Sequence, residues 1–175
     1  MMVSCTPSYY KHSTKKSPTV RKNTTTKVAK TSKTKPEHKS NAYLSSSVKT
    51  ILKEAKSYEG TKYQYGGNTR SGIDCSGLVC NAYSEADIKL PRRSADMANE
   101  GKPVKLSEVK EGDLLFFATS GGSTISHVAI VHHINDAGEV FFIHSSSSKG
   151  VTISSLEETY WKNRFVKAKR IVGES

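Results

Sequence analysis

Apolar residues recur with a helical period in the region that follows the first quarter of the chain. A first helix is predicted from Ser46, behind a serine-rich N-cap, and Gly60 is placed to end it. Asp74 can cap a second helix, and Ser94 a short third one that ends at Gly101. The apolar faces of the first two helices are Val48, Ile51, Leu52 and Ala55, and Leu78, Val79, Ala82 and Tyr83.

The later part of the chain contains short apolar runs that are typical of strands. Between the last two runs, the sequence Ser154-Ser155-Leu156-Glu157 has the form of a capping box and predicts a short helix toward Trp161. Helices first and strands afterwards indicate an α+β domain with a largely antiparallel sheet. The predicted strands are 114–117, 128–134, 140–144, 151–153 and 164–172.

Residues 6–45 differ in composition: they are rich in Ser, Thr, Lys and Asn, and their few apolar residues follow neither a strand nor a helix period. Such a segment buries too little apolar surface to offset the entropy of ordering, so a disordered basic linker is predicted. The globular domain is then expected at 46–172.

The formal net charge of +11 is concentrated in the same stretch. Residues 1–47 carry ten Lys and Arg against one acid, Glu37, whereas residues 48–175 carry 17 against 15 acids. A folded nucleic-acid reader would show a basic stripe, aromatic platforms or a known motif inside the domain, and the sequence shows none. Nucleic acid is therefore not the expected partner, although the basic tail can contact an anionic polymer or surface.

The chain begins Met1-Met2-Val3-Ser4-Cys5, with a small residue followed by cysteine. This resembles the end of a bacterial lipoprotein signal, whose cysteine becomes the lipidated N-terminus, but the charged and apolar parts of such a signal are absent. Two interpretations stay open: a shortened start with Cys5 as a lipid anchor, or an accidental likeness. No apolar run reaches the roughly 20 residues that a membrane span needs.

The sequence Asp-Cys-Ser-Gly at 74–77 opens the second predicted helix, behind a Tyr- and Gly-rich loop at 63–67. A cysteine at a helix N-terminus faces unpaired backbone N–H groups and the positive end of the helix dipole, which favour its thiolate. Cys80 lies about 140° further around the helix and points elsewhere. Three cysteines are too few for a disulfide scaffold, so Cys75 is either a small buried core residue or a nucleophile.

The choice depends on whether a histidine reaches Cys75. Of the six histidines, His12 and His38 lie in the predicted linker, and the other four surround one predicted hairpin. With a four-residue loop at 135–138, Ile134 pairs with Glu139, which fixes the register of the two strands.

That register places His127 and His144 on one face of the hairpin. His144 opposes the residue two positions after His127, so the two imidazoles are diagonal neighbours within about 7 to 8 Å. His132 points to the other face. His133 shares the face of His127 but lies about 20 Å from it along the strand. Cys75, His127 and His144 therefore have the pattern of a nucleophile, a base and a base-orienting group.

These residues belong to a longer series of motifs. In order, the chain contains YQYGG at 63–67, DCSGLV at 74–79, LPRRS at 90–94, GDLLFF at 112–117, SHVAIV at 126–131 and FIHS at 142–145. Together they resemble the NlpC/P60 family of cell-wall cysteine peptidases over about residues 46–172. The resemblance implies a papain-like α+β fold, with N-terminal helices packed on a mainly antiparallel sheet.

The resemblance also implies hydrolysis of the amide bond between γ-D-glutamate and a diamino acid, meso-diaminopimelate or lysine, in peptidoglycan stem peptides, with no metal or other cofactor. It makes Cys75 the nucleophile, His127 the general base and His144 the orienting residue. Asp74 resembles the acid that receives a free stem-peptide amine in relatives. The residues implied in substrate binding or oxyanion stabilisation are Tyr63, Asp74, Ser76, Arg92 and Ser94.

A bacterial cell-envelope location follows from the same resemblance, periplasmic or anchored to the outer membrane through Cys5. The implied partner is peptidoglycan or a muropeptide, and a monomer is expected. The chain departs from the family pattern at Arg93 and Met97, where Thr and Gln are frequent, and at Ala129, where Gly is frequent. The 17-position separation of the two histidines also exceeds the usual spacing.

Three other functions remain open. An amidase or acyltransferase of the same superfamily would use the same thiol chemistry, because one fold hosts both transfer and hydrolysis. A non-catalytic wall-binding module would keep the fold alone. A zinc site built from Cys75, His127 and His144 would lack the paired CxxC or HxxxH spacing of known sites.

Overall fold

The computed structural model describes residues 45–173 of the 175-residue chain. The lipoprotein-like start with Cys5 and the predicted linker up to residue 44 lie outside the described residues. Within residues 45–173, no helix is long and apolar enough to cross a bilayer. The domain predicted at 46–172 lies within the described residues.

Two helices form the N-terminal part of this domain. Helix α1 spans Ser46–Ser57, and the Ser45 hydroxyl caps its first turn. Helix α2 spans Cys75–Ser84, and the Asp74 carboxylate caps it by accepting a hydrogen bond from the backbone N–H of Gly77 (2.6 Å). Both helices begin where the capping residues of the sequence predict them.

The third helix, α3, spans Ser94–Met97. Its N-cap position is Arg93, which makes no side-chain cap bond, so the prediction of Ser94 as the cap is wrong by one residue. Arg93 has an extended backbone (φ −93°, ψ 136°), and Ser94 becomes the first helical residue. The helix ends before Gly101. This glycine has a positive φ of 64° and directly precedes the strand that begins at Lys102.

In the described residues, a six-stranded sheet has the order β3-β8-β4-β5-β6-β7, and every neighbouring pair is antiparallel. This confirms the predicted α+β class with a mainly antiparallel sheet. The strands are β3 (Lys102–Val104), β4 (Leu114–Phe117), β5 (His127–Ile134), β6 (Val140–Ser146), β7 (Gly150–Ser155) and β8 (Phe165–Arg170).

The sequence did not predict several short elements. Strands β1 (Asn68–Thr69) and β2 (Gly72–Ile73) form a two-stranded sheet of their own, and two residues are too few to show an alternating pattern. Strand β3 contains Pro103 and lies at the sheet edge, where a missing N–H breaks no interior ladder. A single 3₁₀ turn, Leu106–Glu108, follows it.

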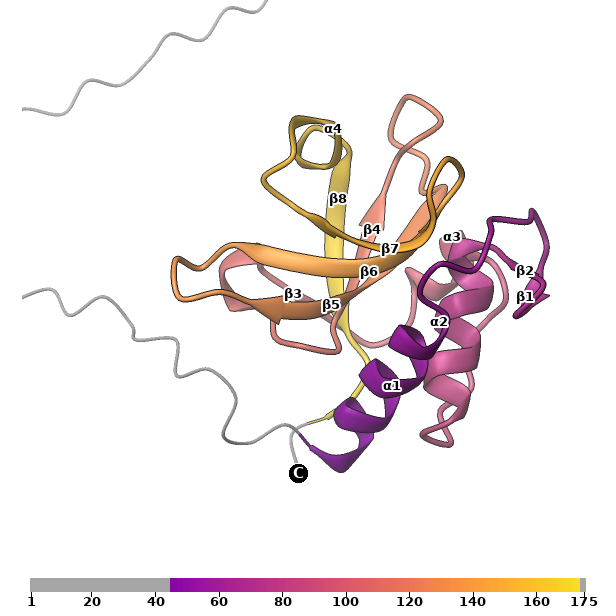
Figure 1. Cartoon of the computed structure of the whole chain (residues 1–175). Coiled ribbons are helices and arrows are strands. Elements are labelled where there is room, and N and C mark those ends of the chain that lie inside the picture. The colour runs from indigo at the N-terminus through magenta and orange to yellow at the C-terminus, as the bar shows by residue number, and fades with distance from the viewer. Residues whose placement is uncertain (1–44, 174–175) are drawn as a thin grey trace, which may run out of the picture. The chain divides into compact units, whose positions relative to one another are not determined.

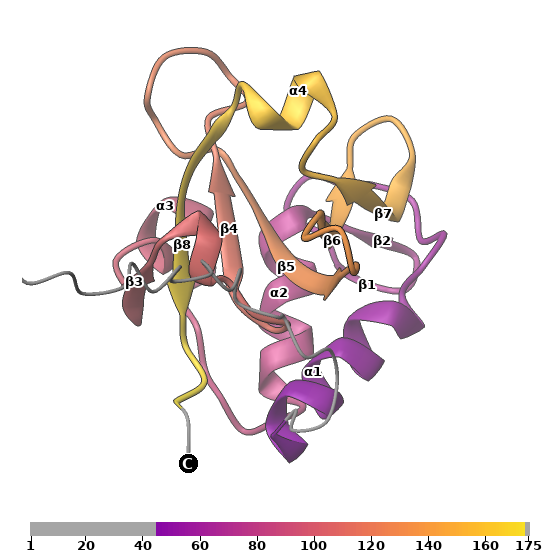
Figure 2. The ribbon, with the colours of Figure 1, turned by 90° about the vertical axis from the view of Figure 1, so that its left-hand side faces the viewer.

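The two faces of the large sheet bury different partners. One face packs against α1 and α2, through buried residues that include Ile51, Leu78, Phe116, Ile130 and Ile143. The alternate strand positions, among them Phe117 and Phe142, pack with Trp161 of the short helix α4 (Thr159–Lys162). Figures 1 and 2 show α1 and α2 side by side against the sheet and α4 between β7 and β8.

The hairpin between β5 and β6 differs from the prediction at two points. Ile134 pairs with Val140 rather than Glu139, because the loop has one residue more than expected. A bulge between Val131 and His133 then shifts the register back, and Ile130 pairs with Ile143. The two shifts cancel, so the strand segments that carry His127 and His144 keep the predicted register.

The predicted capping box also lies one residue further along the chain. The Ser155 hydroxyl accepts a hydrogen bond from the N–H of Glu157, and the Glu158 carboxylate accepts one from the N–H of Ser155 (both 3.0 Å). Helix α4 begins only after this turn, at Thr159. Ser154 is consequently a strand residue of β7 and is not a cap.

Candidate active site

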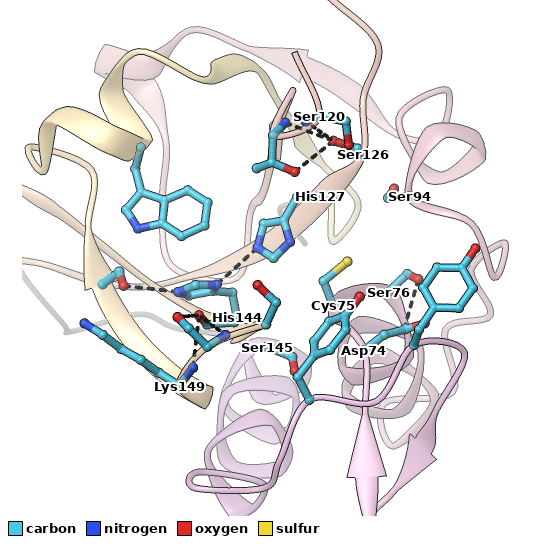
Figure 3. A pocket seen from close by; sticks show the side chains of 18 of the residues that line it. Asp74, Cys75, Ser76, Ser94, Ser120, Ser126, His127, His144, Ser145 and Lys149 are labelled. Carbon is cyan, nitrogen blue, oxygen red and sulfur yellow. Dashed lines mark hydrogen bonds between the residues drawn. The ribbon is translucent and has the colours of Figure 1, made fainter.

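Cys75 is the first residue of α2 and lies at the floor of a groove between the helices and the sheet. Its side chain is buried, with 7% of its surface exposed. A parallel bridge between Tyr63 and Ile73 brings the 63–67 loop beside it. Figure 3 shows the side chain of Cys75 between the ring of His127 on one side and Asp74 and Ser76 on the other.

His127 and His144 form a hydrogen-bonded pair above the groove floor. Nε2 of His127 lies 3.1 Å from Nδ1 of His144, and Nε2 of His144 lies 3.1 Å from the Ser154 hydroxyl (Figure 3). The three residues come from the neighbouring strands β5, β6 and β7. The groove therefore contains Cys75, His127 and His144, the three residues that the sequence selected, and Ser154 in addition.

This arrangement determines which ring nitrogen is available to the thiol. Because Nε2 of His127 faces His144, its Nδ1 is the nitrogen left for Cys75. For Nδ1 to accept a proton, Nε2–H must donate to Nδ1 of His144, and Nε2–H of His144 must then donate to Ser154. The Ser154 hydroxyl can act as this last acceptor, so its contact with His144 supports the tautomers that the base role of His127 requires.

Trp161 covers the histidine pair. Its ring stacks on His127 (centroids 5.3 Å apart, 26° between planes) and meets His144 edge to face (4.7 Å, 78°). Phe117 and Phe142 close the remaining apolar side. Sequence reasoning did not assign Trp161 to the site, because only the spatial return of α4 over the sheet brings it there.

Burial sets the protonation of the two imidazoles. Desolvation lowers the pKa of His127 from 6.5 to about 4. Desolvation, followed by the neighbouring His127 and Lys149, lowers the pKa of His144 to about 3. Both rings are therefore neutral at pH 7, and His127 is ready to accept a proton.

Cys75 differs from the sequence-based expectation of a favoured thiolate. Burial raises the pKa of its thiol above the ordinary value, and the backbone N–H of Val128 opposes this only in part. The helix N-terminus does favour the thiolate, but the loss of water outweighs it. The resting site accordingly pairs a neutral thiol with a neutral imidazole.

Asp74 and Arg92 form a bidentate ion pair next to the cysteine. The Asp74 carboxylate accepts two hydrogen bonds from Arg92 (both 2.8 Å), and others from the N–H groups of Gly66 and Gly77 and the hydroxyl of Ser76. Burial alone would raise the pKa of Asp74, but the bonds from Arg92 and Gly77 lower it below the ordinary value. An incoming substrate amine would have to share the Asp74 carboxylate with Arg92. The expected role of Asp74 in binding that amine stays a prediction.

The groove has a volume of about 970 Å³ and contains all eight residues that the sequence assigned to catalysis and substrate binding. Ser76, Ser94 and Asp74 lie on one side of the sulfur atom, and Ser145 and Lys149 lie on the other (Figure 3). Tyr63 and Arg92 also line it. Burial, followed by the nearby Cys75, raises the pKa of the Tyr63 hydroxyl, which therefore stays protonated as a donor.

His132, His133 and Cys80 do not line this groove. His132 and His133 contact each other through their Nδ1 atoms (2.9 Å), because the bulge turns both rings to one side. The predicted separation of these two rings onto opposite faces is therefore wrong. Cys80 contacts the carbonyl oxygens of Leu90 and Pro91.

A metal site does not emerge from the geometry. Among residues 45–173, no group of three or more His, Cys, Asp or Glu side chains is arranged to hold a metal ion. His127 and His144 each use a ring nitrogen on the other, and His144 uses its second one on Ser154.

The depressed pKa of His127 predicts the acid limb of the pH profile. The base form of His127 persists down to about pH 4, so kcat/KM on a peptide substrate should stay near its neutral value at pH 5.5. An imidazole with the ordinary pKa of about 6.5 would already have lost most of its base form there. Initial rates between pH 4 and 7 measure this limb.

Folding stability must be followed in the same experiment. Between about pH 6.5 and 4 the unfolded chain binds more protons at His127 than the folded one does, so stability is complete above pH 6.5 and falls as the pH decreases. Circular dichroism at each pH separates unfolding from titration. An acid limb centred near pH 6.5 in a fully folded protein would contradict the neutral resting site.

Comparison with known proteins agrees with this geometry. The model of the NlpC/P60 family matches residues 60–170. The chain is 42% identical over 135 residues to the probable endopeptidase NlpC of Escherichia coli (strain K12), covering 75% of this chain and 84% of that protein. It is 39% identical over 126 residues to the murein DD-endopeptidase MepS/murein LD-carboxypeptidase of the same strain, covering 71% and 63%.

A solved structure gives the same result. The fold matches a protein from Staphylococcus aureus subsp. aureus Mu50, described as similar to lipoprotein, NLP/P60 family, with a TM-score of 0.65 and 30% identity. The match covers 75% of this chain and 43% of that one. The family model covers residues 60–170, a range that contains Cys75, His127 and His144, and the chain belongs to the NlpC/P60 family.

Proposed function

We propose that the protein is a cysteine peptidase that hydrolyses the γ-D-glutamyl–diamino acid amide bond of peptidoglycan stem peptides. The main support is an open groove that Cys75 lines together with His127, whose ring contacts His144 and, through it, Ser154. Relatives named as murein endopeptidases, and a γ-DL-glutamyl hydrolase of Bacillus subtilis that is 37% identical over 137 residues, support the substrate class.

The first half of the reaction forms an acyl-enzyme. Nδ1 of His127 takes the thiol proton as the sulfur of Cys75 attacks the γ-carbonyl carbon, which avoids a free buried thiolate. In this proposal, backbone N–H groups at the start of α2 and the hydroxyl of Tyr63, which lines the groove, donate to the oxyanion. Such donors typically contribute about 3 to 4 kcal/mol each. The imidazolium then returns its proton to the leaving amine, and the C–N bond breaks.

The second half releases the acyl group. Water loses a proton to Nδ1 of His127 and attacks the thioester, and the sulfur leaves as the thiol when that proton returns. His144 stabilises the imidazolium in both halves by accepting its Nε2–H. His127 therefore carries every proton, and the buried side chains of Cys75 and His127 need no lasting separation of charge.

Digestion of purified muropeptides tests the proposal. Mass spectrometry should find two product peptides whose masses sum to the mass of the substrate plus one water. One of them should carry a new free amine on the diamino acid. Transfer of the acyl group to an added amine in place of water would favour an acyltransferase of the same superfamily. Binding to wall fragments without any new amine would favour a wall-binding module.

The proposal extends to the cell envelope, where the substrate lies. Peptidoglycan hydrolysis requires the domain to reach the wall, and the basic residues before position 48 suit contact with an anionic polymer. Lipidation of Cys5 would provide the anchor. Mass spectrometry of the native protein tests this, because an unmodified Cys5 behind an intact Met1 would remove the anchor.

A graded loss is expected along the histidine relay. His144→Ala should lower kcat by about 10²-fold, and Ser154→Ala by several-fold. Neither residue reacts with the substrate: His144 orients His127, and Ser154 acts only through His144. KM should change little in both variants. Steady-state kinetics on one muropeptide measures the difference.

Ser154→Thr is the matched control, since it keeps the hydroxyl that accepts from His144. It should retain more activity than Ser154→Ala. Equal activity of Ser154→Ala and the wild type would mean that Ser154 does not hold the tautomer. Circular dichroism must show that His144→Ala keeps its fold, because that ring is buried against Trp161.

A further inference from the structure

The charged side chains of the groove differ in how they are neutralised. Arg92 is paired with Asp74, and Arg93 lies 4.0 Å from Asp96. Lys149 lines the same groove, and no carboxylate of residues 45–173 lies within ion-pair distance of its ammonium group. The groove thus offers a cation without an acidic partner in the described part of the chain.

The backbone around Lys149 is held in place although its side chain is exposed. Lys149 lies in the turn between β6 and β7, directly before Gly150. The N–H of Gly60 donates to the carbonyl of Val151, and the N–H of Val151 donates to the carbonyl of Thr61 (both 2.9 Å). Gly150 has a φ of 72°, and a Cβ there would lie 2.3 Å from the Thr61 oxygen, so the turn sits tightly on this segment.

Lys149 also lies on a defined side of the reacting atoms. The leaving amine must lie within reach of His127, the group that protonates it. Figure 3 shows Ser94, Ser76 and Asp74 on one side of the Cys75 sulfur, and Ser145 and Lys149 on the side of His144. The acyl part of the substrate therefore lies toward Ser94, and the departing diamino acid toward Lys149.

The two common diamino acids differ in charge at the end of the side chain. Meso-diaminopimelate ends in a carboxylate and an ammonium group, whereas lysine ends in an ammonium group alone. An unpaired ammonium on the protein attracts the first and repels the second.

Resting on the function proposed above, we propose that Lys149 binds the side-chain carboxylate of the diamino acid, so that the protein prefers diaminopimelate-type stem peptides. Lys149 is then a specificity residue on the leaving-group side, whereas Cys75 and His127 carry out the chemistry on either substrate. Sequence reasoning left this preference open.

The test uses two matched tetrapeptides, L-Ala-γ-D-Glu-meso-diaminopimelyl-D-Ala with its side-chain carboxylate free or amidated. The wild type should cleave the free form with a kcat/KM about three- to fivefold higher, the size typical of an exposed ion pair. Lys149→Gln should bring this ratio close to one, and Lys149→Glu should invert it. Raising the salt concentration should reduce the wild-type ratio, because the pair is exposed.

Lys89→Gln is the control, because it removes the same charge from an exposed position that does not line the groove. It should keep the wild-type ratio. A ratio that is unchanged in Lys149→Gln, or a wild-type ratio of one, would overturn the assignment while hydrolysis itself continued. Failure of the wild type to cleave either peptide would overturn the proposed function together with this inference.

Discussion

Replacing Cys75 with alanine is expected to lower kcat/KM for muropeptide hydrolysis by at least about 10⁴-fold. The sulfur atom forms the covalent bond in the first half of the proposed reaction, and no other thiol of residues 45–173 lines the groove. The side chain contributes little to packing, because only one sulfur atom is lost at the first position of α2. Product formation followed by mass spectrometry, on protein whose circular dichroism matches the wild type, measures the loss.

Cys80→Ser is the matched control. Cys80 lies on the same helix, but its sulfur contacts the carbonyl oxygens of Leu90 and Pro91 and does not line the groove. The variant should hydrolyse muropeptides at close to the wild-type rate. Iodoacetamide should inactivate the wild type with the label on Cys75. Substantial turnover by Cys75→Ala, or inactivation with the label on Cys80 alone, would remove Cys75 as the nucleophile.

The helices and the longer strands were predictable because their signals are local. Asp74 caps α2 with its own side chain, and the apolar positions of both helices repeat with the helical period. Strand β4 has exactly the predicted bounds because its four apolar residues are buried on both faces of a central strand. Strands β1 and β2 had no such signal, since each has two residues and depends on the other for its structure.

The meeting of His127 and His144 was predicted, but by a register that contained two errors. One extra loop residue would have turned every later side chain of β6 to the opposite face. The bulge at His132 reverses that shift, and neither glycine nor proline marks it in the sequence. The alternation of side chains could therefore predict that the two histidines share a face. It could not predict the longer loop or the bulge that together preserve this register.

Burial was the property that sequence could not supply. The helix-start position of Cys75 predicted a favoured thiolate, and the structure raises its pKa because water is excluded around it. Trp161 and Ser154 were missed for a related reason: only the folding of α4 and β7 against β6 brings them to the histidine pair. The capping-box pattern even gave Ser154 another role, one residue away from the actual cap.

Replacing His127 with alanine is expected to have the second-largest effect, about 10³-fold or more in kcat/KM at pH 7. Without the imidazole, the neutral thiol has no acceptor for its proton, and its raised pKa keeps the thiolate scarce. The deficit should therefore shrink as the pH increases, since hydroxide then forms the thiolate that His127 would have generated. Kinetics of wild type and variant from pH 6 to 9 measures this dependence.

This pH dependence separates His127 from a residue that only supports the fold. Cys75→Ala has no thiol to ionise, so its residual activity should not recover at high pH. His132→Ala provides the histidine control, because His132 contacts His133 outside the groove and should leave the rate at pH 7 close to that of the wild type. A His127→Ala deficit that stays constant across the pH range in a folded protein would mean that His127 does not take the thiol proton, and the base would then have to be sought elsewhere in the groove.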